Sequence, residues 1–308
     1  MKNLKIFIIT FLLGVLFWWG INVFQKILEE VIYAKIIEKD FFHFSNTQTS
    51  SLPSCHFSRP EVSAQSALLV AIDKNGREKI IFQKEKNIRM PIASLTKLMT
   101  AIIVTEFYQP DLKIKISSQA IEQPEMIGFL KVGEIFKVED LLYMTLIESS
   151  NDASYALAEI IGIEGFVSLM NLKAQELNLQ DTYFFNPTGI DSKEFINYST
   201  TEDLKELAKY LLKKTFFLEI LSQKEYPLYK EDKSLHHILY NTNKLLEEIP
   251  SLLAGKTGYT LKAGGCLISI LKKEKPETYF IAVILNSPNR FEDMRKLIKY
   301  VSTSCSSN

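Results

Sequence analysis

The sequence predicts an α+β fold in which one antiparallel sheet is built from both ends of the domain and helices lie between its two halves. Strand-like apolar runs occur over residues 66–85 and again over 264–287. Between them, the segment 138–215 carries apolar residues mainly at helical spacing. With 46% hydrophobic residues, the chain has enough apolar material for one large domain, which we place at residues 63–302, followed by a tail, 303–308.

Residues 1–25 are predicted to form a membrane anchor or a signal segment. Lys2 and Lys5 precede residues 6–24, which carry no charge and, at about 1.5 Å per helical residue, cover one bilayer core. An uncleaved transmembrane helix is favoured over a cleaved signal peptide because no A-x-A site follows; a buried core helix is the third alternative. Either of the first two places the rest of the chain outside the cytoplasm. Residues 26–62 are predicted to be a stalk and linker.

The first half of the domain is predicted to mix short strands with one buried helix. The two apolar runs within 66–85 flank the turn signal KNG, which predicts a hairpin. Residues 92–108 predict a buried helix, with Pro91 in its first turn. The alternating stretch 112–118 predicts a strand, and 129–138 predicts a second hairpin.

The second half is predicted to run from helices back to strands. A polar break, ESSN at 148–151, divides two helical stretches. Two apolar runs, GGCLISILKK and ETYFIAVILNS, are separated by a few polar residues and predict an antiparallel strand pair. A final helix over 288–301 closes the domain. Strands from this end are expected to join those of residues 66–85 in one sheet.

Composition excludes several classes of function. Lys+Arg and Asp+Glu both number 36, so the sequence gives no support for a nucleic-acid partner. The three cysteines, at 55, 266 and 305, exclude a zinc ribbon; a Cys55–Cys266 bridge and three free thiols both stay open. His236 and His237 are adjacent and would point different ways, and no H-E-x-x-H pattern occurs. We therefore expect no metal and no cofactor.

The first polar feature of interest is Ser94-x-x-Lys97 at the start of the predicted buried helix. A spacing of three puts both side chains on one helical face, so Lys97 can reach the Ser94 hydroxyl. A serine is a weak nucleophile until a base takes its proton. Lysine serves as that base only when neutral, which needs burial or a nearby positive charge. The alternative is a polar helix start with a lysine that reaches solvent.

Two further polar features occur later in the chain. In Ser149-Ser150-Asn151, a hydroxyl and an amide two residues apart can project to one side of a turn, although an ordinary helix cap is the alternative. In Lys256-Thr257-Gly258, a lysine beside small residues suits a strand edge that a substrate approaches. There the alternative is a solvated lysine before a turn glycine.

Taken together, S-x-x-K, S-x-N and K-T-G in this order resemble the signature of the penicillin-recognising serine enzymes. The stretches PIASLTKLMTA, LIESSNDASYALAE, STTEDLKELA, NTNKLL and GKTGYTLKAGGCLI are similar to the serine D-alanyl-D-alanine carboxypeptidases, the low-molecular-mass penicillin-binding proteins. The resemblance covers about residues 63–302. It implies a β-lactamase/transpeptidase-like fold in which a sheet packs against a helical cluster.

The resemblance also implies catalytic roles. Ser94 would attack the peptide carbonyl of a terminal D-Ala-D-Ala and form an acyl-enzyme, with Lys97 as the general base. Ser149 would relay the proton to the leaving amine, and Asn151 would orient Lys97 and the substrate amide. Water would then hydrolyse the acyl-enzyme.

Substrate binding is implied at the third motif. Lys256 and Thr257 would bind the terminal carboxylate, with Gly258 beside them. The oxyanion would lie between the backbone N–H groups of Ser94 and Tyr259. The implied partners are peptidoglycan stem peptides, β-lactam antibiotics as inhibitors, and the bacterial membrane through the amino-terminal helix. A protein secreted after signal cleavage is the alternative location.

Three alternative functions stay open on the sequence. A DD-endopeptidase acting on peptidoglycan crosslinks would use the same chemistry. A class A β-lactamase would need a deacylating glutamate after the second motif, but the loop QDTYFFNPTGID contains none. A catalytically silent peptidoglycan-binding protein would not need the complete set of motif residues. Many family members carry a smaller β-rich domain after the catalytic one; because only STSCSSN follows the last predicted helix, we expect the amino-terminal span to hold the protein at the membrane.

Overall fold

The computed structural model describes residues 54–55, 59–124, 128–273 and 277–306. The predicted membrane span at residues 6–24 and most of the predicted stalk lie outside these residues. Within them, no single helix has the length and apolar composition to cross a membrane. The helices α5 (Asn151–Glu159) and α6 (Ile163–Glu176) meet that test only as a pair, bent by 97°.

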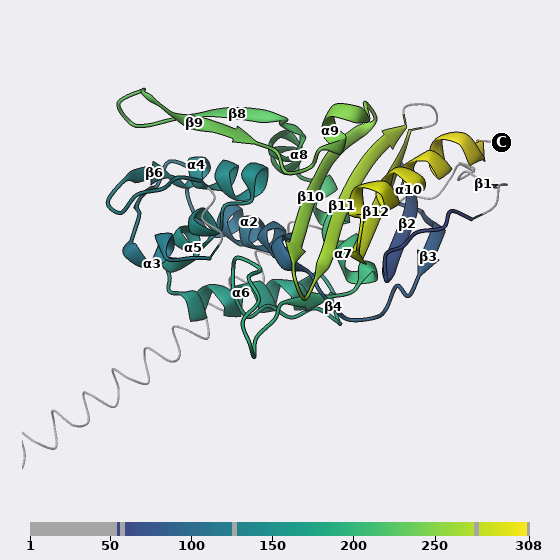
Figure 1. The fold of residues 1–308 in the computed structure, drawn as a ribbon, viewed down its shortest axis with the longest axis horizontal. Helices are drawn as coiled ribbons and strands as arrows, with labels where there is room; N and C mark the ends of the chain where they lie inside the picture. The colour runs from purple at the N-terminus through teal and green to yellow at the C-terminus, as the bar shows by residue number, and fades with distance from the viewer. Residues whose placement is uncertain (1–53, 56–58, 125–127, 274–276, 307–308) are drawn as a thin grey trace, which may run out of the picture. The chain divides into compact units, whose positions relative to one another are not determined.

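A five-stranded antiparallel sheet lies at the centre of the compact unit that spans residues 50–308 (Figure 1). In spatial order its strands are β10 (Leu252–Thr260), β11 (Gly264–Lys273), β12 (Thr278–Ser287), β2 (Ser66–Asp73) and β3 (Glu78–Lys84). The late strand β12 pairs with the early strand β2, with Ile281 opposite Val70. This order confirms the prediction that one antiparallel sheet is built from both ends of the domain.

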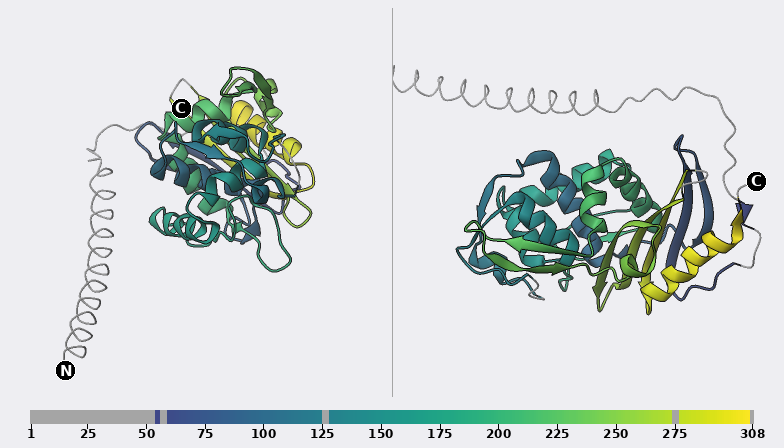
Figure 2. Two further views of the ribbon diagram at one scale, coloured as in Figure 1. Left: turned by 90° about the vertical axis from the view of Figure 1, so that its left-hand side faces the viewer. Right: turned by 90° about the horizontal axis from the view of Figure 1, so that it is seen from above.

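The two faces of the sheet pack against different partners because side chains alternate along each strand. On β2, Leu68, Val70 and Ile72 join the core beneath the helical layer. The intervening residues, Ala67, Leu69 and Ala71, join a second core. The helix α10 (Arg290–Ser304) covers this second face through Met294 and Leu297, and Figure 2 shows it along the sheet.

The helical layer is built around α2 (Thr96–Phe107), which is buried from Thr96 to Val104 and contacts α5 and α6. The remaining described α-helices of the domain are α3 (Ser118–Ile121), α4 (Val138–Tyr143), α7 (Thr201–Leu212), α8 (Thr215–Ser222) and α9 (Leu245–Glu248), of which α9 packs in the second core. Four two-stranded pairs complete the described structure: β4 (Met90–Pro91) with β7 (Tyr198–Ser199), β5 (Lys113–Lys115) with β6 (Ile135–Lys137), β8 (Glu225–Tyr229) with β9 (Leu235–Tyr240), and β1 (Ser54–Cys55) with β13 (Cys305–Ser306).

Two local predictions were wrong. Pro91 does not open the buried helix, because Met90–Pro91 forms β4 and the chain reaches α2 through a 3₁₀ turn, η1 (Ala93–Leu95). The segment 129–138 is not a hairpin of its own, because its second half forms β6 and pairs with β5. In both places, pairing with a distant segment replaced the local structure that the sequence pattern favoured.

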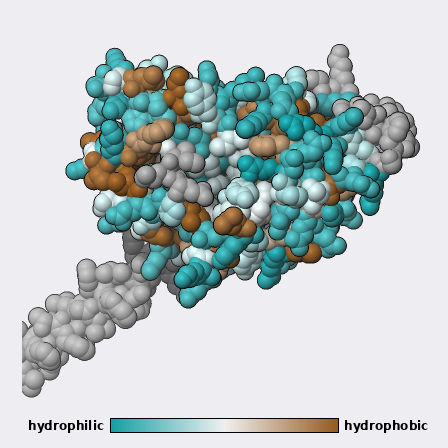
Figure 3. Space-filling model, viewed as in Figure 1, coloured by the Kyte–Doolittle hydropathy of each residue, from teal (hydrophilic) through white to brown (hydrophobic). Residues whose placement is uncertain are grey.

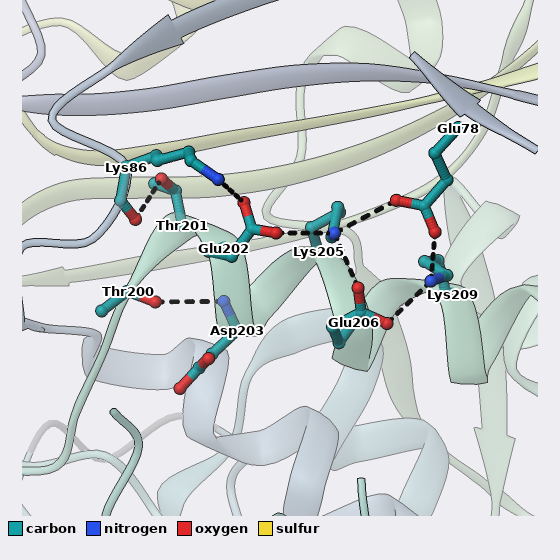
Figure 4. Close-up of polar contacts among 9 residues, drawn as sticks. All are labelled: Glu78, Lys86, Thr200, Thr201, Glu202, Asp203, Lys205, Glu206 and Lys209. Atoms are coloured by element: carbon teal, nitrogen blue, oxygen red, sulfur yellow. Dashed lines mark hydrogen bonds and ion pairs between the residues drawn. The ribbon is translucent and has the colours of Figure 1, made fainter. Parts of the chain in front are cut away.

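The helix α7 is tied to the edge strand β3 by a cluster of ion pairs (Figure 4). Lys205 is buried, and its Nζ lies 3.1 Å from Glu78 of β3, 2.8 Å from Glu202 and 2.6 Å from Glu206. Burial alone would lower the pKa of Lys205, but the hydrogen-bonded carboxylates raise it above its usual range. Lys209 pairs with two of these carboxylates, Glu78 and Glu206, and Lys86 pairs with the third, Glu202.

The cysteine alternatives left open by the sequence are partly resolved. Cys266 is a free thiol, buried on β11, with its Sγ 3.6 Å from the carbonyl oxygen of Pro91. Burial raises the pKa of this thiol to about 11. The Cys55–Cys266 bridge is therefore absent; instead, Cys55 of β1 lies in register with Cys305 of β13.

Candidate active site

The first motif lies where η1 passes into α2. Ser94 belongs to η1 and is partly exposed, whereas Lys97, one turn later, is fully buried. The Lys97 Nζ lies 2.9 Å from the Ser94 Oγ. Ala93 has a φ of 48°, which is uncommon for a residue with a side chain. A strained backbone beside a reactive group is frequent at functional sites, and here it lies next to the candidate nucleophile.

Three oxygen atoms surround the amine of Lys97. Besides the Ser94 hydroxyl, they are Oδ1 of Asn151 at 2.7 Å and the carbonyl oxygen of Thr188 at 2.6 Å. The last two can only accept hydrogen bonds, whereas a hydroxyl can also donate. A neutral lysine has two N–H groups and one lone pair, so it can donate to both acceptors and receive the hydroxyl proton of Ser94. The arrangement therefore suits a general base.

The Thr188 carbonyl is held by the loop NPTGID. Asn186 accepts a hydrogen bond from the Gly189 N–H at 2.7 Å and fixes the turn. Gly189 has a φ of +84°, and a Cβ at this position would lie 2.1 Å from the carbonyl oxygen of Ala93. Only glycine permits this approach, which brings the loop against η1 and the Thr188 oxygen to Lys97.

The second motif follows a π-helical turn, η2 (Met144–Glu148); Ser149 comes directly after it and has a φ of 69°. π-Helical turns are rare in proteins, and many of those that occur lie at functional sites. Ser150 caps α5 by accepting a hydrogen bond from the Ala153 N–H at 3.2 Å. Ser149 and Asn151 instead point to the lysines of the other two motifs. Ser150 therefore has the ordinary role of a helix cap, and its two neighbours, Ser149 and Asn151, contribute to the site.

The third motif lies on β10, the sheet edge that faces η1 and α8. The buried Nζ of Lys256 donates to the Ser149 Oγ at 2.8 Å. Burial, together with the charges of Lys97 and Arg290, lowers the pKa of Lys256 well below its usual range. A positive charge on Lys256 in addition to that on Lys97 is therefore unfavourable. The contact with Ser149 connects Lys256 to the turn that carries the second motif.

The hydroxyl of Thr257 connects the third motif to the second by another route. It donates to the Thr242 Oγ1 at 2.6 Å, and the Thr242 N–H donates to the Ile147 carbonyl at 3.2 Å. Thr242 thus bridges β10 and the π-helical turn before Ser149. In sequence it is only one threonine in NTNKLL, and nothing in its type predicted this position.

Gly258 permits the close approach of β10 to the nucleophile. A Cβ at this position would lie 2.9 Å from the Ile92 carbonyl and 3.0 Å from the Ser94 nitrogen. The Gly258 carbonyl accepts a hydrogen bond from Arg290 Nη1 at 2.7 Å, and the following residue, Tyr259, is exposed. Arg290 was missed by the sequence analysis because a basic residue at a helix start has many possible roles.

Direct contacts connect Lys97 with Ser94 and Asn151, and Lys256 with Ser149. Gly258 packs close to the Ser94 nitrogen, and its neighbours Thr257 and Tyr259 lie beside it on β10. Among the described residues, no group of three or more His, Cys, Asp or Glu side chains is placed to hold a metal ion. The side chains that meet at the site carry hydroxyls, amines and the Asn151 amide.

The comparisons with known proteins decide the family. Residues 54–289 match the model of the peptidase S11 family, which is described as D-alanyl-D-alanine carboxypeptidase. The chain belongs to this family. Its fold is that of the penicillin-binding proteins and DD-transpeptidases, with helices and an antiparallel sheet: the Streptomyces K15 DD-transpeptidase gives a TM-score of 0.71 at 27% identity over 79% of this chain and 98% of that one.

Relatives within the peptidase S11 family carry two kinds of name. The D-alanyl-D-alanine carboxypeptidase DacF of Bacillus subtilis is 37% identical over 68% of this chain but 54% of its own length. The D-alanyl-D-alanine endopeptidase of Escherichia coli is 28% identical over 80% of this chain and 79% of its own. The chain thus matches about half the length of the first relative and more of the second.

Proposed function

We propose that this chain is a serine-type D-Ala-D-Ala carboxypeptidase that removes the terminal D-Ala from peptidoglycan stem pentapeptides. One observation carries the proposal: the Lys97 amine lies between the Ser94 hydroxyl and two oxygens that can only accept hydrogen bonds. Membership of the peptidase S11 family supports the same reaction.

In the proposed reaction, Lys97 takes the Ser94 proton as Oγ attacks the carbonyl carbon of the penultimate D-Ala. The C–N bond to the terminal D-Ala then breaks; Ser149 gives its hydroxyl proton to the leaving amine and receives in return the proton that Lys97 took from Ser94. Asn151 holds Lys97 and the substrate amide in place. Water then attacks the ester on Ser94, which releases the shortened peptide and restores the hydroxyl.

The third motif would bind the substrate. We assign the terminal carboxylate to Lys256 and Thr257, whose polar groups lie on the edge strand next to Ser149. The backbone N–H groups of Ser94 and Tyr259 would stabilise the oxyanion. The close packing of Gly258 against the Ser94 nitrogen supports this pairing.

β-Lactams would acylate the same serine. Penicillin-binding protein D2 of Listeria monocytogenes, solved in cefotaxime- and ampicillin-bound forms, covers 79% of this chain at 28% identity and a TM-score of 0.69. A class A-like β-lactamase is disfavoured because both acids of the 180–191 loop have structural contacts: Asp181 pairs with Arg89, and Asp191 accepts from Thr260 at 2.5 Å. A silent peptidoglycan-binding protein is disfavoured by the connected set of site residues.

The second candidate is a DD-endopeptidase that cuts peptidoglycan crosslinks. Relatives from Escherichia coli and Pseudomonas aeruginosa, each 28% identical, carry that name. The two activities share the acyl-enzyme and differ in the group that leaves: free D-Ala in one case and a crosslinked side chain in the other.

We also propose that the protein acts at the outer side of a bacterial cell membrane. Support comes from the uncharged residues 6–24 and the basic residues before them. In this arrangement residues 1–25 are a single-pass anchor, 26–62 a stalk and 63–302 the catalytic domain. Mass spectrometry of the membrane-associated protein would test this, because a mature amino terminus beyond residue 25 would exclude the anchor.

The deciding experiment combines a covalent probe with two substrates. The full chain should gain the mass of one penicillin, and peptide mapping should place it on Ser94; Ser94→Ala should remain unmodified. D-Ala release from a pentapeptide ending in D-Ala-D-Ala should also depend on Ser94. Cleavage of crosslinked dimers alone would favour the endopeptidase, and folded protein with no added mass would exclude the serine acyl-enzyme.

A further inference from the structure

Four aromatic side chains form a row on the segment between α6 and α7: Tyr198, Tyr183, Phe185 and Phe195. The rings of Tyr183 and Tyr198 are stacked with their centroids 6.3 Å apart. Phe185 lies 4.8 Å from Tyr183, and Phe195 lies 5.3 Å from Phe185. Tyr183 is 43% and Phe195 is 52% exposed. Single exposed apolar residues are ordinary, but a contiguous patch is typical of a binding surface. The proposed reaction assigns no role to this aromatic row.

The local backbone explains why these rings face outward. Side chains alternate along an extended chain, so Tyr183 and Phe185 lie on one face and Phe184 on the other. Phe184 is buried, and Asn171 of α6 accepts from its N–H at 2.9 Å and donates to its carbonyl at 2.8 Å. Tyr183 also exchanges two backbone hydrogen bonds with Tyr198, at 3.0 and 3.1 Å. The segment is therefore fixed by its backbone and by Phe184, and the exposed rings can contact a ligand.

A cavity of about 340 Å³ adjoins the tyrosine end of the aromatic row. Besides the two tyrosines, Leu179 and Thr182, four carboxamide side chains line it: Asn171, Gln175, Asn178 and Gln180. Asn171 is bound to Phe184, but the other three carboxamides form no hydrogen bond within the part of the chain that the structure describes. Because each carboxamide can both donate and accept, the cavity offers several uncommitted polar groups.

The charges around this cavity favour an uncharged ligand. Among the described residues, no charged side chain lines it. Arg89 lies over the Tyr198 ring at 5.6 Å, but it pairs with Asp181 at 2.7 Å. An ion inside the cavity would lose water without meeting an opposite charge, whereas hydroxyl and amide groups would meet the carboxamides.

A second cavity, of about 460 Å³, shows the opposite character. It is lined by parts of β5, β6 and β8 and by the β8–β9 turn, and its charged lining residues are Lys113, Lys137, Lys230, Lys233, Asp140 and Glu231. Figure 3 shows apolar surface over β6 and the β8–β9 hairpin, and Tyr229 beside this cavity is 53% exposed. An exposed tyrosine therefore occurs at both cavities, and the charge of the lining distinguishes them.

The β8–β9 hairpin also corrects an expectation from the sequence. His236 and His237 do not point different ways, because their Nδ1 atoms lie 2.6 Å apart. His237 is opposite Leu228, but the next partners are Tyr229 and Leu235, so His236 is the extra residue of a bulge. A bulge interrupts the alternation of side chains, which allows the neighbouring imidazoles to face each other.

A strand of N-acetylated amino sugars has the chemistry that the aromatic row and its cavity require. Each sugar ring presents a face of C–H groups that packs on an aromatic ring, while its hydroxyl and acetamido groups both donate and accept. In the glycan strand of peptidoglycan, the sugar carboxylates are consumed in the amide bonds to the stem peptides, so the strand is neutral there. A repeating ligand also accounts for several rings in a row.

The aromatic row lies on a segment that also contributes to the candidate active site. The strand β7, which carries Tyr198, pairs with β4, and β4 leads into η1 and the candidate nucleophile. Between Phe185 and Phe195, the same segment carries Thr188, whose carbonyl accepts from Lys97. A strand held on the row would therefore present its stem peptides near Ser94.

We propose that the aromatic row and the adjoining carboxamide cavity bind the glycan strand of peptidoglycan. The rings stack on sugar faces, and Gln175, Asn178 and Gln180 form hydrogen bonds with the hydroxyl and acetamido groups. The inference rests on the proposed function, because the stem peptides of the bound strand are the substrates of Ser94. Binding raises their local concentration and takes no part in the reaction.

Binding of a peptide-free sugar tests the proposal apart from catalysis. The probe is the β-1,4-linked tetramer of N-acetylglucosamine, which is uncharged and contains no D-Ala. Saturation-transfer NMR with the full chain in detergent should give signals from the sugar protons. Tyr183→Ala should weaken binding about tenfold through loss of one ring. Tyr229→Ala removes a similarly exposed tyrosine at the lysine-lined cavity and should bind as the wild type does.

A second variant tests the cavity without removing a ring. The side chains of Gln175 and Gln180 are exposed and form no hydrogen bond to other described residues, so their joint replacement by alanine should not affect folding. Gln175→Ala/Gln180→Ala should weaken tetramer binding about fivefold, the effect expected for loss of about one net hydrogen bond.

Two substrates connect sugar binding to the reaction. D-Ala release should be measured from a free pentapeptide and from pentapeptides still attached to glycan strands. On the attached substrate, Tyr183→Ala should raise KM about tenfold and leave kcat unchanged. On the free pentapeptide, the variant and the wild type should have the same kcat and KM.

Three results would overturn the proposal. The first is the absence of sugar signals with folded wild-type protein, and the second is equal binding by the wild type and Tyr183→Ala. The third is a dimer of the full chain that dissociates in Tyr183→Ala, which would assign the aromatic row to a second copy. Sugar binding that depends on Tyr183, without any release of D-Ala, would support the glycan site and count against the carboxypeptidase.

Discussion

The α7 cluster and the candidate active site both bury lysine side chains, and they treat the positive charge in opposite ways. On α7, Lys205 is held by three carboxylates, which raise its pKa against the effect of burial. In the candidate active site, Lys97 donates to an amide oxygen and a carbonyl oxygen and lies beside a hydroxyl, and Lys256 donates to a hydroxyl and a carbonyl oxygen. Burial is common to both regions, so the partner atoms make the difference.

This contrast shows which lysine can do chemistry. Carboxylates stabilise the charged form of Lys205, so its proton is not available for exchange near neutral pH. Neutral oxygens supply hydrogen bonds without full negative charge, and the pKa of Lys256 falls as a result of burial and of the nearby Lys97 and Arg290. The α7 cluster is thus a structural use of buried lysine, and the active site is a chemical one.

The largest expected effect is from Lys97→Met, which removes the base but keeps similar side-chain bulk. The rate of penicillin acylation should fall by about 10²–10⁴-fold, as for other removals of a general base. Lys205→Met is the matched control and should retain the acylation rate of the wild type. Near-normal acylation by Lys97→Met would remove Lys97 from the proposed chemistry.

A smaller effect is expected from Lys256→Met. Loss of a charge-assisted hydrogen bond to the substrate carboxylate should lower kcat/KM about 10–100-fold on a peptide that ends in a free carboxylate. The corresponding C-terminal amide should be affected much less. Equal losses on the two substrates would mean that Lys256 acts mainly on Ser149 and Lys97, and not on the carboxylate.

Unlike the two active-site variants, Lys205→Met should lower the stability of the protein and leave its acylation rate unchanged. Removing the cation leaves Glu78, Glu202 and Glu206 close together without their shared partner. Because these carboxylates are partly exposed, the free energy of unfolding should fall by about 1–3 kcal/mol. Denaturant unfolding at neutral pH measures this change, and an unchanged midpoint would show that Lys209 and Lys86 balance the cluster without Lys205.

Sequence patterns predicted the sheet because apolar periodicity reports burial directly. The runs of β2, β11 and β12 are mainly apolar between their ends, and the structure pairs them as predicted. Pro91 was misplaced because its role depends on β7, more than a hundred residues away in the chain. Local patterns carry no information about such pairings.

The candidate site was predictable where side chains carry the chemistry and not where the backbone does. Each of the three motifs alone had an ordinary alternative, and they were identified by their order along the chain, which resembles a family signature. The Thr188 carbonyl could not be found from residue type, because every residue has one; the turn residues around Gly189 were the available signal. The facing imidazoles of His236 and His237 required a bulge that the sequence did not reveal.

The smallest predicted effect is on the pH dependence of stability, and it involves one acid from each region, Asp152 beside the second motif and Glu206 of the α7 cluster. Burial raises the pKa of Asp152 to about 6, whereas Lys205 and Lys209 lower the pKa of Glu206 despite its burial. The stability that protonated Asp152 contributes is present below its unfolded pKa of about 4 and is lost as pH rises through about 6. The stability that ionised Glu206 contributes is present above its unfolded pKa. It is lost as pH falls through the lowered pKa of the folded state.

The two acids should therefore give opposite trends when each is replaced by its amide. Between about pH 4 and about pH 7, the Tm of Asp152→Asn should rise relative to wild type by about 2–4 °C, because the variant carries no charge to bury. Over the same interval, the Tm of Glu206→Gln should fall relative to wild type, because only the wild type gains the ion pair. If the Tm of both variants changed in the same direction relative to wild type, ionised Asp152 would not destabilise the fold, and the contrast between the active site and α7 would be wrong.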